Sequence, residues 1–367
     1  MKMLIAGAGP AGLYLGYLVK RQLPDWEVRI VEQNARDSTF GFGVVFSERA
    51  LEFLRADDPR TYERVTPAMQ AWTNITVVHR GTPVVIDGVG FSAIGRLKFL
   101  QLLCGQLEAA GVSPLFDFPV EKENLEEFDL VIAADGANSF VRRTADFGTS
   151  IAPLTNKFAW FGTTRVFDTL TQTFVANEAG TFNAHHYRHS PAMSTFVFEC
   201  DAATWRRAGF ERMGEAETLA YCERVFADAL QGHRLVSNKS IWRNFPNVRN
   251  RRWSAGNKVL IGDAQRTAHF SIGSGTRLAM EDAIALAKCL VDAKRAIPEA
   301  LAAFEARRRP IVEKLVAAAD ASADWYEHFP EHMRLSPRDF AWSYIQRSGR
   351  VDPERLRRVS PRFVAGA

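Results

Sequence analysis

Three glycines near the start of the chain constrain its fold more than any other feature. Gly7, Gly9 and Gly12 form a GxGxxG motif between the apolar run MLIA and the helix-like run LYLGYLVKRQ, and a second apolar run ends in Glu32, 20 residues after Gly12. In such a β-α-β unit the glycines form a tight turn, admit a pyrophosphate and let the helix pack on the strand, while the acid accepts ribose hydroxyls. Glycines that served only a turn would leave Glu32 unexplained. The pattern therefore predicts a dinucleotide site.

Two further motifs distinguish a flavin from a nicotinamide. Asp135 and Gly136 begin DGANSFVR, which matches the pattern DGxxSxxR directly after the buried run LVIAA. Gly262 and Asp263 follow the buried run KVLI. A carboxylate at the end of a strand, such as Asp263, suits a hydroxyl of an extended ribityl chain.

The loop that contains Gly273 and Gly275 leads into a predicted helix over residues 274–293. The free N–H groups at the start of that helix can face the pyrimidine end of an isoalloxazine ring. We expect both glycines to contact the flavin.

Together these motifs resemble those of the para-hydroxybenzoate-hydroxylase-like FAD monooxygenases, which are single-component aromatic hydroxylases. Segments such as IGRLKFLQLL, FNAHHYRH, MSTFVFEC and TAHFSIGSGTRLAMEDAIALA extend the likeness from end to end to members whose hydroxylase part acts on salicyloyl-CoA or anthraniloyl-CoA. A weaker likeness leads to a hydroxylase of a tryptophan-derived intermediate. Many such enzymes carry a further reductase-like domain, and this chain is expected to be a free-standing hydroxylase.

The resemblance and the residue pattern together predict an α/β fold with a Rossmann-like FAD-binding domain, an interleaved β-sheet substrate domain and C-terminal helices. Runs of β-branched and aromatic residues over 157–199 favour an antiparallel sheet. The expected FAD-binding domain comprises residues 1–70, 91–156 and 254–295, the substrate domain 71–90 and 157–253, and the C-terminal helices with a basic tail 296–367.

The polar and apolar pattern also predicts local elements. A helix is expected from Ser47 to just before Pro59, and a hairpin is expected to turn at Arg80 and Gly81. Residues 205–230 are expected to be helical. A long helical stretch after residue 296 is expected to be interrupted at Pro310.

The resemblance implies a chemistry in which NADH or NADPH binds transiently and reduces FAD, and molecular oxygen then forms an electrophilic flavin C4a-hydroperoxide. The implied substrate is an ortho-hydroxy or ortho-amino benzoyl thioester, with 5-hydroxylation of salicyloyl-CoA to gentisyl-CoA as the leading hypothesis. An aryl group on a carrier protein and a tryptophan-derived indole are alternatives. A flavin oxidase or dehydrogenase without oxygen insertion is the alternative class.

Three side chains are candidates for catalysis. Alternation along FNAHHYRH directs His185 and Tyr187 to one face and His186 and Arg188 to the other. The resemblance favours the face of His185 and Tyr187 as the one toward the substrate, although a histidine or tyrosine in a sheet is more often a structural residue. His269, beside the glycine loop, is the third candidate, because an imidazole accepts protons near neutral pH.

Other candidates concern binding. Phe46 and Phe270 are expected to wall an aromatic pocket, and Arg96 matches an arginine that contacts the flavin or its phosphates in the family. The stretch GDAQRTAHF carries Gln265 and Arg266 where many members have other residues. That departure puts some flavin contacts of the family in doubt.

Composition excludes several classes of protein. The chain has a net charge of +4, and no apolar run approaches the ~20 residues that a membrane span needs. No signal peptide and no metal-ligand spacing is recognised, so we expect a cytoplasmic, metal-free monomer or homodimer with four reduced cysteines. Residues 331–367 carry eight arginines against four acids. We expect a solvated helical face there, or contact with phosphates, but no nucleic-acid binding. The tail arginines are Arg347, Arg350, Arg355, Arg357, Arg358 and Arg362.

Overall fold

The N-terminal β-α-β unit forms the centre of a mostly parallel sheet. In the computed structural model, which describes residues 1–47, 51–294 and 296–366, strand β1 (Lys2–Ala6) pairs in parallel with β2 (Glu27–Val31), and helix α1 (Pro10–Gln22) connects them. Strand β8 (Leu130–Ala133) lies on the other side of β1 and is fully buried. The five-stranded order is β15-β16-β8-β1-β2, completed by β16 (Lys258–Leu260) and β15 (Ser254–Ala255). The ends of β1, β8 and β16, where the three motifs begin, therefore meet at one edge.

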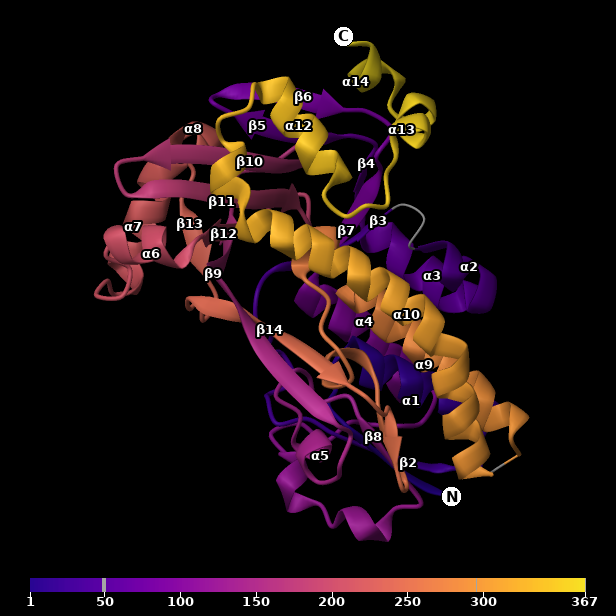
Figure 1. Ribbon diagram of the computed structural model, residues 1–367. Helices are drawn as coiled ribbons and strands as arrows, with labels where there is room; N and C mark the ends of the chain where they lie inside the picture. Colours follow the sequence, from indigo (N-terminus) through magenta and orange to yellow (C-terminus); the bar gives the residue numbers. More distant parts are fainter. Residues whose placement is uncertain (48–50, 295, 367) are drawn as a thin grey trace.

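Helices pack against this sheet on the side of α1. Helix α1 contacts α4 (Arg96–Ala109) and α9 (Gly275–Asp292), and α9 contacts the long helix α10 (Ile297–Glu327), so the four helices lie together (Figure 1). The expected interruption at Pro310 is wrong, because α10 continues through it. A proline removes one backbone hydrogen bond. Buried side chains on both sides of it, Phe304 and Val312, hold the two halves in one helix.

The second layer is an eight-stranded sheet built mainly from the middle of the chain. Its order is β13-β9-β12-β11-β10-β5-β6, with β14 paired to β9. Neighbours are antiparallel, as the sequence predicts for residues 157–199, except that β10 runs parallel to β5. The strands are β5 (Ile75–His79), β6 (Thr82–Ile86), β9 (Thr149–Thr163), β10 (Leu170–Asn177), β11 (Gly180–Arg188), β12 (Ser194–Cys200), β13 (Leu235–Ser237) and β14 (Arg243–Asn250).

The hairpin of β5 and β6 turns where it was predicted. Arg80 and Gly81 both adopt positive φ, 52° and 72°, which suits a two-residue turn between twisted strands. Strand β9 runs through the boundary expected at residue 156, so one strand joins the two regions; the division into domains stays a prediction.

A three-stranded sheet lies between these layers. It comprises β3 (Gly43–Ser47), β7 (Phe91–Gly95) and β4 (Gln70–Trp72). The predicted helix from Ser47 is placed differently, because Ser47 ends β3, and helices α2 (Glu52–Asp57) and α3 (Pro59–Val65) follow. Residues 48–50 of that prediction lie outside the described residues.

Short helices complete the fold. The stretch 205–230, expected to be helical, is divided into several helices around Gly209, which has a φ of 82°, and Gly214. At the C-terminal end, α12, α13 and α14 lie beside β5 and β6 (Figure 1). No helix of the described ranges is long and apolar enough to cross a membrane. The helices not yet named are α5 (Phe140–Arg143), α6 (Ala202–Arg207), α7 (Glu215–Val225), α8 (Ala227–Leu230), α11 (Phe329–His332), α12 (Pro337–Gln346), α13 (Pro353–Val359) and α14 (Pro361–Ala365).

Candidate functional site

One large cavity lies between the parallel sheet and the eight-stranded sheet. Its volume is about 1360 Å³. That exceeds the ~300–1,000 Å³ typical of a pocket for one drug-sized ligand. The cavity has two ends, which we name by their residues. Its nucleotide end is lined by Gly7, Gly9, Glu32, Asp135 and Asp263, and its aromatic end by Phe158, Trp160, Gln172, His185, Phe245 and Phe270.

The first glycine motif brings backbone to the nucleotide end. Gly7 has a φ of +101°, and a Cβ atom there would lie 2.4 Å from the carbonyl oxygen of Ala134. A Cβ on Gly12 would lie 2.0 Å from the carbonyl oxygen of Gly7, so only glycine lets α1 approach the strand this closely. A Cβ on Gly9 would meet no protein atom within 4 Å. The space beside Gly9 belongs to the cavity.

Glu32 lies at the end of β2, on the cavity wall. Its Oε2 accepts a hydrogen bond from the N–H of Ala8 at 2.9 Å, and its Oε1 accepts one from the N–H of Asn34 at 2.9 Å. These contacts hold the carboxylate against the glycine turn. Oε1 also accepts a hydrogen bond from the side-chain amide of Asn34 at 2.6 Å, so the lone pair left for a ligand hydroxyl is on Oε2.

The DGxxSxxR segment joins the other two motifs. Asp135 Oδ2 accepts hydrogen bonds from the N–H groups of Phe140 and Val141, whereas its Oδ1 is buried without a partner. Burial raises the pKa of this carboxyl, and its hydrogen bonds oppose the rise. Arg142 Nη1 donates to the carbonyl of Ala264 at 2.8 Å, which ties this segment to the turn at Gly262 and Asp263.

The turn at Gly262 and Asp263 is held by buried charges. Arg266, one of the residues that depart from the family pattern, donates to the carbonyl of Gly262 at 2.9 Å and pairs with Asp282 at 2.7 Å. Arg308 of α10 pairs with the same carboxylate at 3.0 Å. The unusual arginine therefore braces the turn from behind and does not line the cavity.

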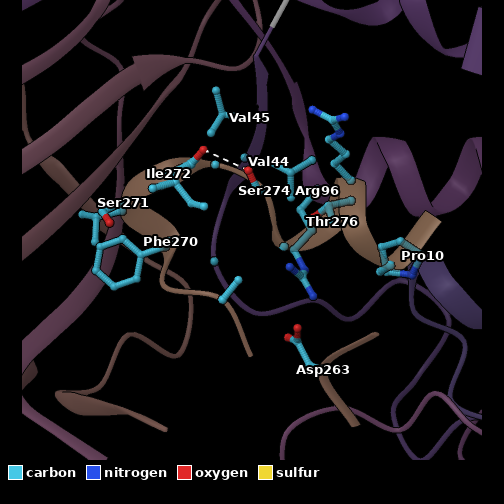
Figure 2. A pocket seen from close by; sticks show the side chains of 18 of the residues that line it. Pro10, Val44, Val45, Arg96, Asp263, Phe270, Ser271, Ile272, Ser274 and Thr276 are labelled. Carbon is cyan, nitrogen blue, oxygen red and sulfur yellow. Dashed lines mark hydrogen bonds between the residues drawn. The ribbon is translucent and has the colours of Figure 1, made fainter. Parts of the chain in front are cut away.

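Asp263, from this turn, and Arg96, from the start of α4, both line the cavity (Figure 2). Enclosure by protein raises the pKa of Asp263, and the positive charges of Arg266 and Arg96 oppose the rise. Arg96 Nε is buried without a partner, and burial lowers the pKa of its guanidinium.

The second glycine loop lines the cavity where its two ends adjoin. Phe270, Ser271 and Ile272 precede Gly273, which has a φ of +60°, and Ser274 Oγ donates back to the carbonyl of Ile272 (Figure 2). Gly273 and Gly275 both line the cavity. Arg347 Nη2 donates to the carbonyl of Ser271 at 2.8 Å, so the C-terminal segment holds this loop in place.

Four aromatic side chains surround the aromatic end. The ring of Phe270 lies 5.0 Å from that of Phe158, 5.8 Å from Trp160 and 6.0 Å from Phe245, measured between centroids. Such spacings are typical of packed aromatic rings. Of these four, sequence reasoning identified only Phe270. Phe158 and Trp160 could have been found from the alternation along β9, which places both side chains on one face of the strand.

His185 lines the aromatic end, and its ring nitrogens face polar partners. Nδ1 lies 3.0 Å from Gln172 Nε2, and Nε2 lies 3.6 Å from a carboxylate oxygen of Glu199. Tyr326 donates to Gln172 Oε1 at 3.0 Å, and Asn156 donates to the second oxygen of Glu199 at 3.0 Å. Burial lowers the pKa of His185 to about 3 and raises that of Glu199. The imidazole is therefore neutral, and the carboxyl group of Glu199 lies close enough to offset the positive charge that the ring would gain with a proton.

Tyr187 shares the face of His185 and also lines the cavity. Its hydroxyl donates to the carbonyl of Gly43 at 3.0 Å, which joins β11 to β3. Burial raises its pKa. His186 faces the opposite side, where its ring stacks on Phe196 and contacts Thr173.

Besides Gly12, which serves the packing of α1, two candidates do not line the cavity. Phe46, expected to wall the pocket, is buried against Phe99 because Val45 and Ser47 take the cavity positions on either side of it in β3. His269 lies behind Phe270, with its Nδ1 2.8 Å from Ser271 Oγ. Burial lowers the pKa of His269 to about 4.

The nucleotide end fits FAD. It offers the open space at Gly9, the unpartnered Arg96 Nε and Asp135 Oδ1, and the cavity-facing carboxylate of Asp263. These are the donors and acceptors that phosphates and hydroxyls require. Within the described ranges, no group of three or more His, Cys, Asp or Glu side chains is arranged to hold a metal ion.

Comparisons with known proteins agree with this geometry. Residues 108–319 match a family described as an FAD binding domain. The chain is 43% identical over 361 residues to a salicyloyl-CoA 5-hydroxylase of a Streptomyces species, a match that covers 95% of this chain and 70% of that protein. It is 35% identical over 333 residues to a 3-hydroxy-4-methyl-anthranilyl-(aryl-carrier protein) 5-monooxygenase of Streptosporangium sibiricum, a match that covers 90% of each. The tetrameric form of 2-methyl-3-hydroxypyridine-5-carboxylic acid oxygenase shares the fold, with a TM-score of 0.73 and 18% identity over 98% of this chain and 95% of that one.

Proposed function

This chain belongs to the FAD-dependent aromatic monooxygenases that carry this FAD binding domain, and from that premise we propose that it hydroxylates an ortho-hydroxy or ortho-amino benzoyl thioester. The leading substrate is salicyloyl-CoA, with hydroxylation at position 5 to give gentisyl-CoA. In that reaction one atom of molecular oxygen enters the ring and the other leaves as water. NADH or NADPH supplies the two electrons and binds transiently.

One observation carries the proposal: the nucleotide end and the aromatic end belong to one continuous cavity. A dinucleotide bound along the glycine motifs would extend past Asp263 to the loop of Gly273. That loop also carries Phe270, whose ring belongs to the aromatic end. The cofactor and the substrate ring therefore have adjoining places.

Bound flavin, once reduced, supplies the chemistry that activates molecular oxygen. The residues of the aromatic end orient the ring and exclude water. Phe158, Trp160, Phe245 and Phe270 offer apolar faces that pack on an aryl group. Exclusion of water protects the activated oxygen from unproductive release as hydrogen peroxide.

We propose that His185 accepts the proton of the ortho substituent. The lone pair of the neutral imidazole is on Nδ1, which faces the amide of Gln172, so Nδ1 would take the proton in exchange for that hydrogen bond. The carboxyl group of Glu199, 3.6 Å from Nε2, would stabilise the resulting charge. Gln172 and Tyr326 fix the ring of His185 in place. Tyr187 and His269 act in this proposal as positioning residues, because their polar atoms contact Gly43 and Ser271.

The test is a substrate panel for the purified FAD-loaded enzyme. Consumption of NADH and NADPH is measured with salicyloyl-CoA, anthraniloyl-CoA, free salicylate, an aryl group on a carrier protein and indoles, and product mass is determined for each. We expect a mass gain of one oxygen atom with a benzoyl-CoA thioester. A thioester that accelerates NAD(P)H consumption but yields only hydrogen peroxide is an effector, and that outcome would contradict the proposal.

A further inference from the structure

Four arginines of the C-terminal segment line the cavity, and one of them, Arg347, donates to the carbonyls of Tyr344 and Ser271. The other three lie beyond the aromatic end. They are Arg350, Arg355 and Arg358, which we call the arginine rim. None of the three makes an ion pair with any residue in the part of the chain that the structure describes. The tail arginines are thus divided, because Arg357 and Arg362 do not line the cavity. The expected solvated face accounts for only part of them.

Like charges gather at the rim. Partial burial lowers the pKa of Arg350, and the positive charges of Arg277 and Arg355 lower it further. Arg277 is paired with Glu281, but the acids of the segment itself, Asp352 and Glu354, do not line the cavity. The rim is therefore an uncompensated patch of positive charge, which suits a polyanion.

The rim has a fixed position in the fold. Asp87, after β6, accepts hydrogen bonds from the N–H groups of Arg362 and Phe363 at the start of α14. A Cβ on Gly88 would lie 1.6 Å from the carbonyl oxygen of Val359, so α13 closely approaches the β6–β7 connection. Leu356 of α13 is fully buried. Arg355 and Arg358 are therefore presented by a docked helix.

A continuous wall connects the aromatic end with the rim. Gln172 stands opposite His185 in the β10–β11 ladder, and Leu170 shares the face of Gln172. Leu170 pairs with Ile75 of β5, which also lines the cavity. Past β6 the wall continues through Gly88 to α13. A ligand with its ring beside His185 can thus extend across the strands to the arginines.

We propose that the arginine rim binds the phosphate-bearing nucleotide of a coenzyme A thioester whose aryl group occupies the aromatic end. This inference rests on the proposed function, because it takes the substrate to be a CoA thioester. Arg355 and Arg358 are three residues apart on α13 and so present neighbouring guanidinium groups to the phosphates. Arg350, just before the helix, adds the third.

The same phosphate chemistry occurs in a reducing nucleotide. NADPH carries a pyrophosphate and a ribose phosphate, as coenzyme A does. The continuous wall from the rim to His185 favours the thioester, and the experiment separates the two sources.

The experiment compares Arg355→Gln and Arg358→Gln with Arg357→Gln in the FAD-loaded enzyme. Arg357 lies on the same helix, carries the same charge and faces away from the cavity. Calorimetry measures the Kd of free coenzyme A, which needs no turnover. We expect each rim variant to raise that Kd roughly tenfold and the Arg357 variant to leave it within about twofold.

Kinetics supply the second readout. The KM for the CoA thioester should rise in the rim variants, while kcat at saturation and the KM values for NADH and NADPH stay unchanged. An N-acetylcysteamine thioester lacks the nucleotide, so its KM should be the same in every variant. Raised salt should weaken binding of coenzyme A to the unaltered enzyme, a measurement that needs no variant to fold.

Four outcomes would overturn the inference: an unchanged Kd for coenzyme A, an equal effect of Arg357→Gln, salt-independent binding of coenzyme A, or a raised KM for NADPH alone. Turnover of an aryl group only on a carrier protein, with no binding of coenzyme A, would also overturn it. Failure of the proposed function would give a different result from failure of this inference. If no benzoyl-CoA thioester is hydroxylated while the rim variants still weaken binding of coenzyme A, the rim stands and the substrate assignment falls.

Discussion

The two ends of the cavity are built in different ways. At the nucleotide end the decisive features are backbone turns, such as Gly7 with its positive φ and Gly12, where a Cβ would strike the carbonyl of Gly7. At the aromatic end they are side chains from four strands and one loop, brought together by sheet register. His185, for example, meets Gln172 because β10 and β11 pair in one particular register.

This difference implies different sensitivities. Substitutions at the nucleotide end should change cofactor affinity and leave the chemistry of the loaded enzyme intact. Substitutions at the aromatic end should change turnover and leave cofactor affinity intact. Variants that affected both quantities equally would show that the two ends do not act separately.

The largest effect is expected from His185→Gln. Loss of a general base typically costs a factor of ~10²–10⁴, so kcat with the accepted thioester should fall by that range. The Kd of FAD, measured by recovery of flavin fluorescence, should stay within about twofold.

The matched control is His186→Gln. His186 is the next residue on β11 and is equally buried, but it faces Phe196 instead of the cavity. At pH 7.5 this variant should keep kcat near that of the unaltered enzyme. If both variants lose turnover alike, the strand as a whole is responsible and His185 has no special role.

A smaller effect, on FAD affinity instead of turnover, is expected from Glu32→Ala. The variant removes the carboxylate that faces the cavity and holds the N–H of Ala8. Hydrogen bonds to a charged group typically contribute ~1.5–3 kcal/mol, so the Kd of FAD should rise about ten- to a hundredfold. With saturating FAD, kcat should be nearly unchanged.

Glu27→Ala provides the control for this change, because Glu27 lies exposed at the other end of β2. It should leave FAD affinity unaltered. An unchanged FAD affinity in Glu32→Ala itself would mean that the ribose contact has been assigned to the wrong residue.

The same difference explains what could be predicted from the sequence. Backbone turns leave a local signature, so Gly7, Asp135 and Asp263 could be identified before their convergence was seen. Gln172 was missed because its place depends on pairing with a strand 13 residues away, although a hairpin turned after Asn177 would have placed it opposite His185. Phe46 was misplaced because alternation defines two faces of a strand without saying which one meets the cavity.

Two other differences arose from tertiary contacts. Pro310 was expected to interrupt a helix, a local preference that packing of α10 overrides. The tail arginines were expected to lie on a solvated helical face or to contact phosphates. Docking of α13 against the β6–β7 connection places Arg355 and Arg358 on the cavity wall and Arg357 outside it. Neither contact leaves a local pattern in the sequence.

The smallest effect concerns acid stability and distinguishes the sheet of the aromatic end from the rest of the molecule. Burial lowers the pKa of His186 from 6.5 to about 3. The unfolded chain therefore binds this proton at a higher pH than the folded chain does, and stability must fall as pH drops below about 6.5. Between pH 7.5 and 5.5 this residue should account for about 1.4 kcal/mol of lost unfolding free energy.

Urea unfolding at the two pH values measures this loss. The unfolding free energy of His186→Gln should fall by about 1.4 kcal/mol less than that of the unaltered chain over the same interval, whatever its absolute stability. An equal loss in His186→Gln and the unaltered chain would show that this histidine is not held neutral by the sheet.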